Sequence, residues 1–146
     1  MNIYFACSIT GGREFEAVYQ DLTAALLSDG HEVPTAHLAD SGVLQLEAVV
    51  SPADVYQRDV TWIRAADALI AEVSVPSHGV GYEVGYALQT GKRVLCLFRQ
   101  GCKVSKMITG NPDPNLQVRT YLDNQEAVAL LRVFLAELNT SPPQQN

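Results

Sequence analysis

The chain has 146 residues, of which 47% are hydrophobic and 18% are charged, a composition typical of one globular domain. Sixteen acidic against ten basic residues give a formal net charge of −6, which argues against a nucleic-acid partner because phosphate backbones bind basic surfaces. No window approaches the roughly 18 apolar residues of a membrane span, and no signal peptide precedes the first apolar run. Three cysteines without paired spacing indicate neither a zinc site nor disulfides, so we expect a cytoplasmic protein that binds no membrane.

Short apolar runs alternate with longer segments of helical period, which is typical of βα units around a parallel sheet. We predict strands at residues 2–7, 31–33, 67–73, 93–98 and 116–121. Helices are expected at residues 14–28, 55–66, 82–90 and 125–138, with a helical turn over 103–108. The sequence therefore predicts an α/β fold with a five-stranded parallel sheet, in which residues 1–139 form one domain and residues 140–146 a disordered tail.

Two loops at the carboxyl ends of predicted strands are the first places to look for a site, because open parallel sheets bind ligands there. The loop after the first strand contains Ser8, Gly11, Gly12 and Arg13. It matches neither the phosphate-loop motif nor the dinucleotide fingerprint. A plain strand-to-helix turn therefore remains as open as a ligand-binding loop.

The loop after residues 67–73 contains Ser77, Gly79 and Gly81 just before a predicted helix. The dinucleotide pattern G-x-G-x-x-G fails at Val84, so a nicotinamide cofactor is not expected. Hydroxyl and backbone N–H groups at a helix N-terminus can instead hold an anion. Glu83 would point at whatever the anion is attached to, or it would simply complement the helix dipole.

The predicted helix over residues 55–66 carries one carboxylate on its apolar face. Helical spacing puts these residues on one side: Val55, Asp59, Trp62, Ile63 and Ala66. Because burying an unpaired carboxylate is costly, Asp59 would be either a protonated acid or bonded to a backbone group or an arginine. Together with Glu83 it would form the two-carboxylate set that cleaves glycosidic bonds through a covalent intermediate.

Four other side chains have both a functional and a structural interpretation. Tyr4 on the first strand could orient a carboxylate or pack beneath a helix. His37 and His78 could contact a ligand, but neither has neighbours at metal-binding spacing, so no metal site is predicted. Ser105 could contact a ligand or cap a short helix.

Taken together, the sequence resembles the 2′-deoxynucleoside 5′-monophosphate N-hydrolase family, within the nucleoside 2-deoxyribosyltransferase superfamily. The resemblance runs from Ile3 to about Leu138 and rests on several separated matches in the right order. They are Ile3-Tyr4-Phe5, Ser8-Ile9, Gly11-Gly12-Arg13-Glu14, Arg58-Asp59 with Trp62, Gly79-Val80-Gly81-Tyr82-Glu83, and Leu95-Cys96-Leu97-Phe98-Arg99 leading to Ser105 and Met107-Ile108.

The resemblance implies a Rossmann-like three-layer sandwich that uses no metal or organic cofactor. It implies that Glu83 attacks the anomeric carbon, that Asp59 supports departure of the base by proton donation or substrate positioning, and that Tyr4 orients the nucleophile. The residues expected to bind substrate are Ser8, Ile9, Gly11, Gly12, Arg13, His37, Ser77, Gly79 and, from the other subunit of a homodimer, Ser105.

The activity implied is hydrolysis of 2′-deoxynucleoside 5′-monophosphates to the free base and 2-deoxyribose 5-phosphate. The alternatives are a 2-deoxyribosyltransferase, a ribonucleotide N-glycosidase of the CMP type, and a nucleotide-binding module without turnover. Thr10 stands where the family commonly has an arginine, and Cys7 where a glycine is usual. Base preference and the choice between deoxyribose and ribose therefore stay open.

Overall fold

The computed structural model describes residues 1–9, 14–39, 42 and 49–140 of the chain. Four parallel strands form one sheet in the order β1 (Ile3–Ala6), β2 (Ala68–Glu72), β3 (Arg93–Arg99) and β4 (Leu116–Tyr121). In the register of the sheet, Phe5 lies beside Ile70, and Ile70 beside Leu95. Strands β1 and β2 are buried along their whole length, as expected for strands covered on both faces.

The prediction of a fifth strand at residues 31–33 was wrong. Glu32 makes a single parallel bridge to Asn2, with 2.8 Å between the Ile3 nitrogen and the Glu32 carbonyl oxygen. The chain cannot extend this ladder because Pro34 has no N–H group to donate, and it turns at once into the 3₁₀ helix η1 (Ala36–Ala39). The bridge lies on the side of β1 opposite β2, so the order of segments reverses at β1.

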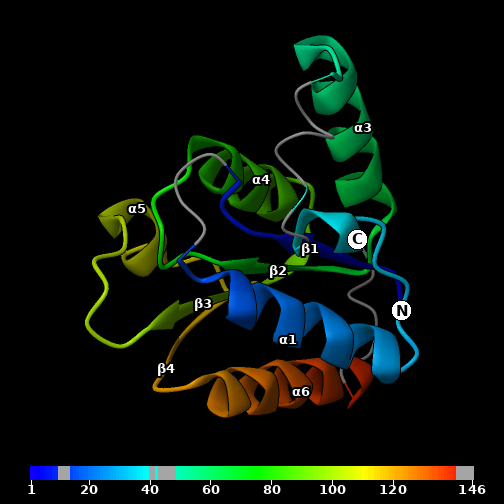
Figure 1. The fold of residues 1–146 in the computed structure, drawn as a ribbon. Helices are drawn as coiled ribbons and strands as arrows, with labels where there is room; N and C mark the ends of the chain where they lie inside the picture. Colours follow the sequence, from blue (N-terminus) through cyan, green and yellow to red (C-terminus); the bar gives the residue numbers. More distant parts are fainter. Residues whose placement is uncertain (10–13, 40–41, 43–48, 141–146) are drawn as a thin grey trace.

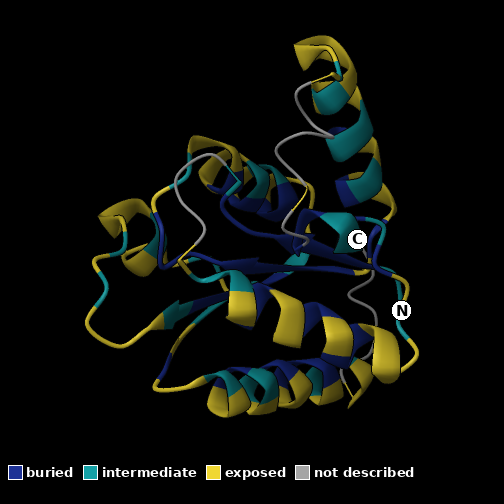
Figure 2. Ribbon diagram, in the orientation of Figure 1, coloured by how far each residue is buried: buried dark blue, intermediate teal, exposed yellow. Residues whose placement is uncertain are grey.

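Helices cover both faces of the sheet (Figure 1), the α/β arrangement of a Rossmann-like fold. Helices α1 (Glu16–Ser28) and α6 (Asn124–Thr140) pack on one face, while α3 (Pro52–Ala65) and α4 (His78–Gln89) pack on the other. Alternation along β1 sends Phe5 into the first core and Tyr4 into the second. Tyr4 therefore faces α3 and α4, and Figure 2 shows buried residues concentrated between the layers.

Two helices begin earlier than predicted because a serine side chain caps the N-terminus of each. Helix α3 begins at Pro52 after the N-cap Ser51, and α4 begins at His78 after the N-cap Ser77. The predicted turn over residues 103–108 is the short helix α5 (Lys106–Thr109). Helix α6 includes Thr140, the first residue of the predicted tail, and residues 141–146 lie outside the described part of the chain.

No helix in the described part of the chain combines the length and the apolar character needed to cross a bilayer.

Candidate active site

A cavity of about 510 Å³ brings together the two carboxylates singled out in the sequence. Asp59 from α3 and Glu83 from α4 both line it. The segment after β1 contributes Cys7 and Ile9 to the same wall. The cavity therefore opens where the strand order reverses, at the carboxyl ends of the strands, as open parallel sheets predict.

Glu83 is positioned by a buried tyrosine from the sheet. The Tyr4 hydroxyl donates a hydrogen bond of 2.7 Å to Oε1 of Glu83, and Tyr4 itself is fully buried. Burial raises the pKa of Glu83 to about 7, with a further contribution from the negative charge of Asp59 and with the Tyr4 bond and the Arg58 charge acting in the opposite direction. Glu83 can therefore exchange between its acid and carboxylate forms near neutral pH.

Tyr4 keeps its proton in this environment. Burial, together with the charges of Glu83 and Asp59, raises its pKa far above the ordinary value for a phenol. A phenol that stays protonated can act only as a hydrogen-bond donor toward the carboxylate, so it stabilises the ionised form of Glu83.

Asp59 is paired with its neighbour in the sequence. The Arg58 Nε lies 2.8 Å from Oδ1 of Asp59, and the two side chains are 23% and 16% exposed. The guanidinium of Arg58 also lies 5.0 Å from the centre of the Trp62 ring. Of the two states that the sequence left open for Asp59, the structure has the one bonded to an arginine.

The apolar face of α3 differs from the predicted one. The residues of α3 that are fully buried are Val60 and Ile63, whereas Val55 and Trp62 are only partly buried. Ile63 and Ala66 of the predicted stripe are buried, and Val60, which the stripe did not include, is buried with them. Asp59 is left at the border of the buried face, on the wall of the cavity.

The start of α4 gives the cavity a polar end. Ser77 and Gly79 line it, and the Ser77 Oγ accepts a hydrogen bond of 3.4 Å from the Val80 nitrogen as the N-cap of the helix. The N–H groups of a first helical turn and the helix dipole favour an anion at this point. Leu38 and Val60 add an apolar part to the wall of the same cavity.

Several residues predicted to bind substrate are not on the described wall of this cavity. Ser8 is fully buried, between Cys7 and Ile9. The His37 ring packs edge-on against Trp62, with ring centres 6.1 Å apart. Residues 10–13, which include Thr10, Gly11, Gly12 and Arg13, lie outside the described residues.

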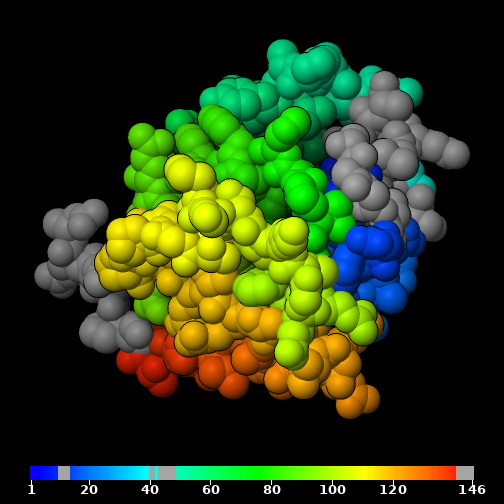
Figure 3. Space-filling view, turned by 90° about the vertical axis from the view of Figure 1, so that its left-hand side faces the viewer, coloured from blue at the N-terminus to red at the C-terminus, as the bar shows by residue number. Residues whose placement is uncertain are grey.

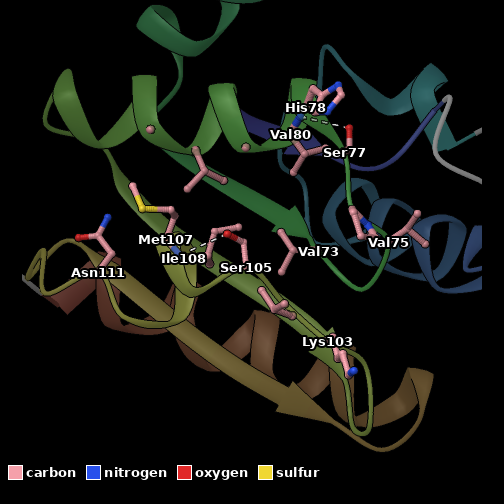
Figure 4. Close-up of a pocket in the computed structure, with 15 residues that line it drawn as sticks. Val73, Val75, Ser77, His78, Val80, Lys103, Ser105, Met107, Ile108 and Asn111 are labelled. Carbon is pink, nitrogen blue, oxygen red and sulfur yellow. Dashed lines mark hydrogen bonds between the residues drawn. The ribbon is translucent and has the colours of Figure 1, made fainter.

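Ser105 faces a second hollow, of about 700 Å³, on the other side of the start of α4. Its hydroxyl caps α5 by accepting a hydrogen bond of 3.2 Å from the Met107 nitrogen, which is the structural role that the sequence left open. Figure 4 shows Ser105 and Met107 facing Ser77 and Val80 across this hollow. In the space-filling view of Figure 3, the yellow segment around α5 stands beside the green α4.

Sequence reasoning missed two tyrosines of the cavity wall, Tyr56 and Tyr82. Tyr82 directly precedes Glu83, and Tyr56 lies one helical turn before Asp59. Their positions beside the two carboxylates in the sequence could have identified them, but composition and apolar periodicity do not reveal such positions. Within the described ranges, no three His, Cys, Asp or Glu side chains come together as a metal-binding group.

Comparisons with known proteins find relatives over most of the chain. A model of the nucleoside 2-deoxyribosyltransferase family matches residues 3–118. A Methanosarcina mazei protein with the provisional name 2′-deoxynucleoside 5′-phosphate N-hydrolase 1 is 39% identical over 94% of this chain and 85% of its own length. The 5-hydroxymethyl-dUMP N-hydrolase of Mus musculus is 41% identical over 94% of this chain and 82% of its own. A solved CMP N-glycosidase of Clostridium botulinum, at 23% identity, shares the fold with a TM-score of 0.70 over 91% of this chain and 99% of that one.

Proposed function

The chain belongs to the nucleoside 2-deoxyribosyltransferase family, and on that basis we propose that it hydrolyses 2′-deoxynucleoside 5′-monophosphates to the free base and 2-deoxyribose 5-phosphate. One observation carries the proposal. Glu83, with a pKa raised to about 7, shares a cavity with Asp59 and with the anion-binding start of α4. The names of the two N-hydrolase relatives support the same class of substrate.

In the first step, the Glu83 carboxylate attacks C1′ of the sugar. A bond forms between C1′ and the carboxylate oxygen, the C1′–N bond breaks, and its electron pair leaves with the base. The hydrogen bond from Tyr4 to Oε1 holds the carboxylate in one orientation and favours its ionised form.

In the second step, water attacks C1′ and the ester bond to Glu83 breaks. Glu83 leaves as a carboxylate, and the proton released by water passes to the base anion formed in the first step. One water is consumed, and the enzyme returns to its starting state. No other reactant is required for this sequence.

Asp59 is better suited to positioning than to donating a proton. Arg58 Nε lies 2.8 Å from one of its oxygens, which fixes the carboxylate where it can accept hydrogen bonds from the substrate. We therefore assign Asp59 to holding the sugar or the base in line with Glu83, where a small displacement is costly in rate.

The remainder of the nucleotide would be bound by other residues of the cavity wall. Ser77 and Gly79 at the start of α4 would hold the 5′-phosphate, and the apolar wall formed by Leu38 and Val60 would receive the base. Ser105 would contribute to the phosphate site from the other subunit of a homodimer, and the protein would work in the cytoplasm.

The test is an assay for free base. Purified protein is incubated with deoxynucleotides, ribonucleotides and unphosphorylated nucleosides, and the released base is measured by chromatography. We expect base from deoxynucleoside monophosphates, at least 10³-fold less with Glu83→Gln, and a covalent adduct in the mass spectrum when a slow 2′-fluoro substrate is used. Equal rates for the Glu83→Gln variant and the wild type would end the proposal.

The second candidate is base exchange, which the name of the matched family favours. A transferase would use the same intermediate but would pass the sugar to a second base instead of water. Adding a different free base to the assay separates the two. A new nucleotide forming faster than free sugar phosphate would establish the transferase.

A further inference from the structure

The first half of α3 has few described contacts with the rest of the molecule, although it forms part of the active-site wall. The buried residues of α3, Val60 and Ile63, both lie in its second half. Figure 1 shows the first turns projecting beyond the neighbouring elements, and Figure 2 shows them largely exposed. Val55, from this exposed half, lines the cavity. The width of the cavity therefore depends on what holds these turns in place.

One contact crosses from this half of α3 to α4. The hydroxyl oxygens of Tyr56 and Tyr82 lie 3.3 Å apart, and their ring centres are 6.1 Å apart. Both side chains line the cavity and are about half exposed, Tyr56 at 52% and Tyr82 at 50%. The pair therefore bridges, at the mouth, the two helices that carry Asp59 and Glu83.

The Tyr82 ring is itself held in place from the other side. It stacks on Tyr86, with ring centres 6.0 Å apart and an angle of 14° between the planes. The Arg64 guanidinium lies 5.6 Å from the centre of the Tyr86 ring. Arg64 belongs to the end of α3, so the row Arg64, Tyr86, Tyr82 and Tyr56 connects the two ends of α3 across the surface of α4.

Building on the proposed function, we propose that Tyr56 and Tyr82 form a latch that limits the width of the base-binding part of the cavity, so that pyrimidine nucleotides are preferred over purine nucleotides. A bicyclic base needs more room along the apolar wall of Leu38 and Val60, which Val55 of α3 extends. Making that room moves the first turns of α3 and breaks the hydroxyl contact. The two tyrosines are positioning residues and contact none of the reacting atoms.

Three variants that each remove a single hydroxyl test the latch. Tyr56→Phe and Tyr82→Phe keep the rings and remove one partner of the contact. Tyr86→Phe is the matched control, because the Tyr86 hydroxyl is buried and bonds to none of the described residues. Thermal unfolding verifies that all three variants fold.

The first measurement is specificity. In Tyr56→Phe and in Tyr82→Phe, the ratio of kcat/KM for purine over pyrimidine deoxynucleoside monophosphates should rise about fivefold, mainly through KM, because one neutral hydrogen bond is lost. The double variant should match the single ones, because both disrupt the same bond. Tyr86→Phe should keep the wild-type ratio. An unchanged ratio in the latch variants, or an equal loss of rate on every base, overturns the selection of base by size.

The second measurement does not need catalysis. Hydrogen exchange at the amides of residues 55–59 should be faster in Tyr82→Phe than in the wild type or Tyr86→Phe, although the substitution lies on the other helix. Unchanged exchange overturns the latch. If the wild type released no base at all, the proposed function would fail, and this exchange result would still decide whether the latch exists.

Discussion

At the scale of single residues, Glu83 carries a cost in stability that depends on pH. Its pKa is about 7 in the folded protein, against an ordinary value of 4.5, so the folded state holds the proton more tightly than the unfolded state. The contribution of this proton to the free energy of unfolding is therefore fully present below pH 4.5 and is lost as the pH rises through about 7. Above that pH the ionised, buried carboxylate costs about 3 kcal/mol.

The Glu83→Gln variant removes that cost because an amide does not ionise. At pH 8 the variant should be more stable than the wild type by about 3 kcal/mol, measured by urea unfolding. Near pH 4, where the wild-type carboxyl is protonated, the two proteins should unfold at nearly the same urea concentration. A stability difference that did not change with pH would mean that Glu83 is not held in a desolvated site.

Tyr4 and burial shift the pKa of Glu83 in opposite directions. The Tyr4 hydrogen bond lowers the pKa of Glu83, so Tyr4→Phe should move the acid limb of the kcat/KM profile to higher pH. The loss of a hydrogen bond to a charged group predicts a rate about tenfold lower at pH 7. Raising the pH to 9 should recover most of that loss, because the nucleophile is then ionised in both proteins.

Asp59 provides the matched comparison on the other helix. Its negative charge contributes to the raised pKa of Glu83, so Asp59→Asn should move the acid limb to lower pH while also lowering kcat. A profile that moved the same way in both variants would contradict the electrostatic coupling between these three side chains.

At the scale of elements, the sequence predicted the parts of the fold that local pattern controls. Apolar runs located β2 and β3. The glycines before Glu83, expected in the loop, instead belong to the first turn of α4, because the Ser77 side chain caps that helix. For Tyr4 the residues alone left two roles open, and its bond to Glu83 agrees with the role that the resemblance implied.

What the sequence could not supply depends on contacts between distant segments. Residues 31–33 look like a strand, but only one bridge to Asn2 forms, because the neighbouring proline ends the ladder. The contact between Tyr56 and Tyr82 joins residues that are 26 positions apart in the chain. Periodicity within one helix contains no information about such a pair.

Glu72 joins the carboxyl ends of three strands and gives a prediction at this scale. It is fully buried at the end of β2, and it accepts hydrogen bonds from the hydroxyl of Ser74 and, at 3.0 Å, from that of Tyr121 on β4. The Ser74 hydroxyl in turn accepts from the Arg99 nitrogen of β3 at 2.8 Å. Burial raises the pKa of Glu72, and these hydrogen bonds act against that shift.

Removing the Glu72 carboxyl group should destabilise the carboxyl ends of β2, β3 and β4. Glu72→Ala leaves two buried hydroxyls without their partner, which should lower the free energy of unfolding by about 3 kcal/mol. Glu72→Gln keeps the size and an acceptor oxygen, so its loss should be about 1 kcal/mol. Urea unfolding measures both. Equal stability of the alanine variant and the wild type would show that the network contributes nothing.

At the scale of the whole molecule, Ser105 indicates how two copies would cooperate. It lines the hollow beside α5 and is absent from the described wall of the Glu83 cavity of its own chain. Met107, next to it on α5, is 83% exposed, which is unusual for a large apolar side chain. The proposed homodimer would bring Ser105 to the phosphate in the site of a second copy.

Mixing two defective variants tests this arrangement. Glu83→Gln lacks the nucleophile, and Ser105→Ala should bind nucleotide about tenfold more weakly, because one hydrogen bond to a charged phosphate is lost. In a mixed dimer, the Glu83 of one chain meets the Ser105 of the other, and one complete site is restored. After random exchange of subunits and with substrate well below KM, the mixture should reach about a quarter of the wild-type rate, well above the mean of the separate variants. A rate equal to that mean would place Ser105 outside the partner's site, and a monomer in light scattering would exclude the shared site altogether.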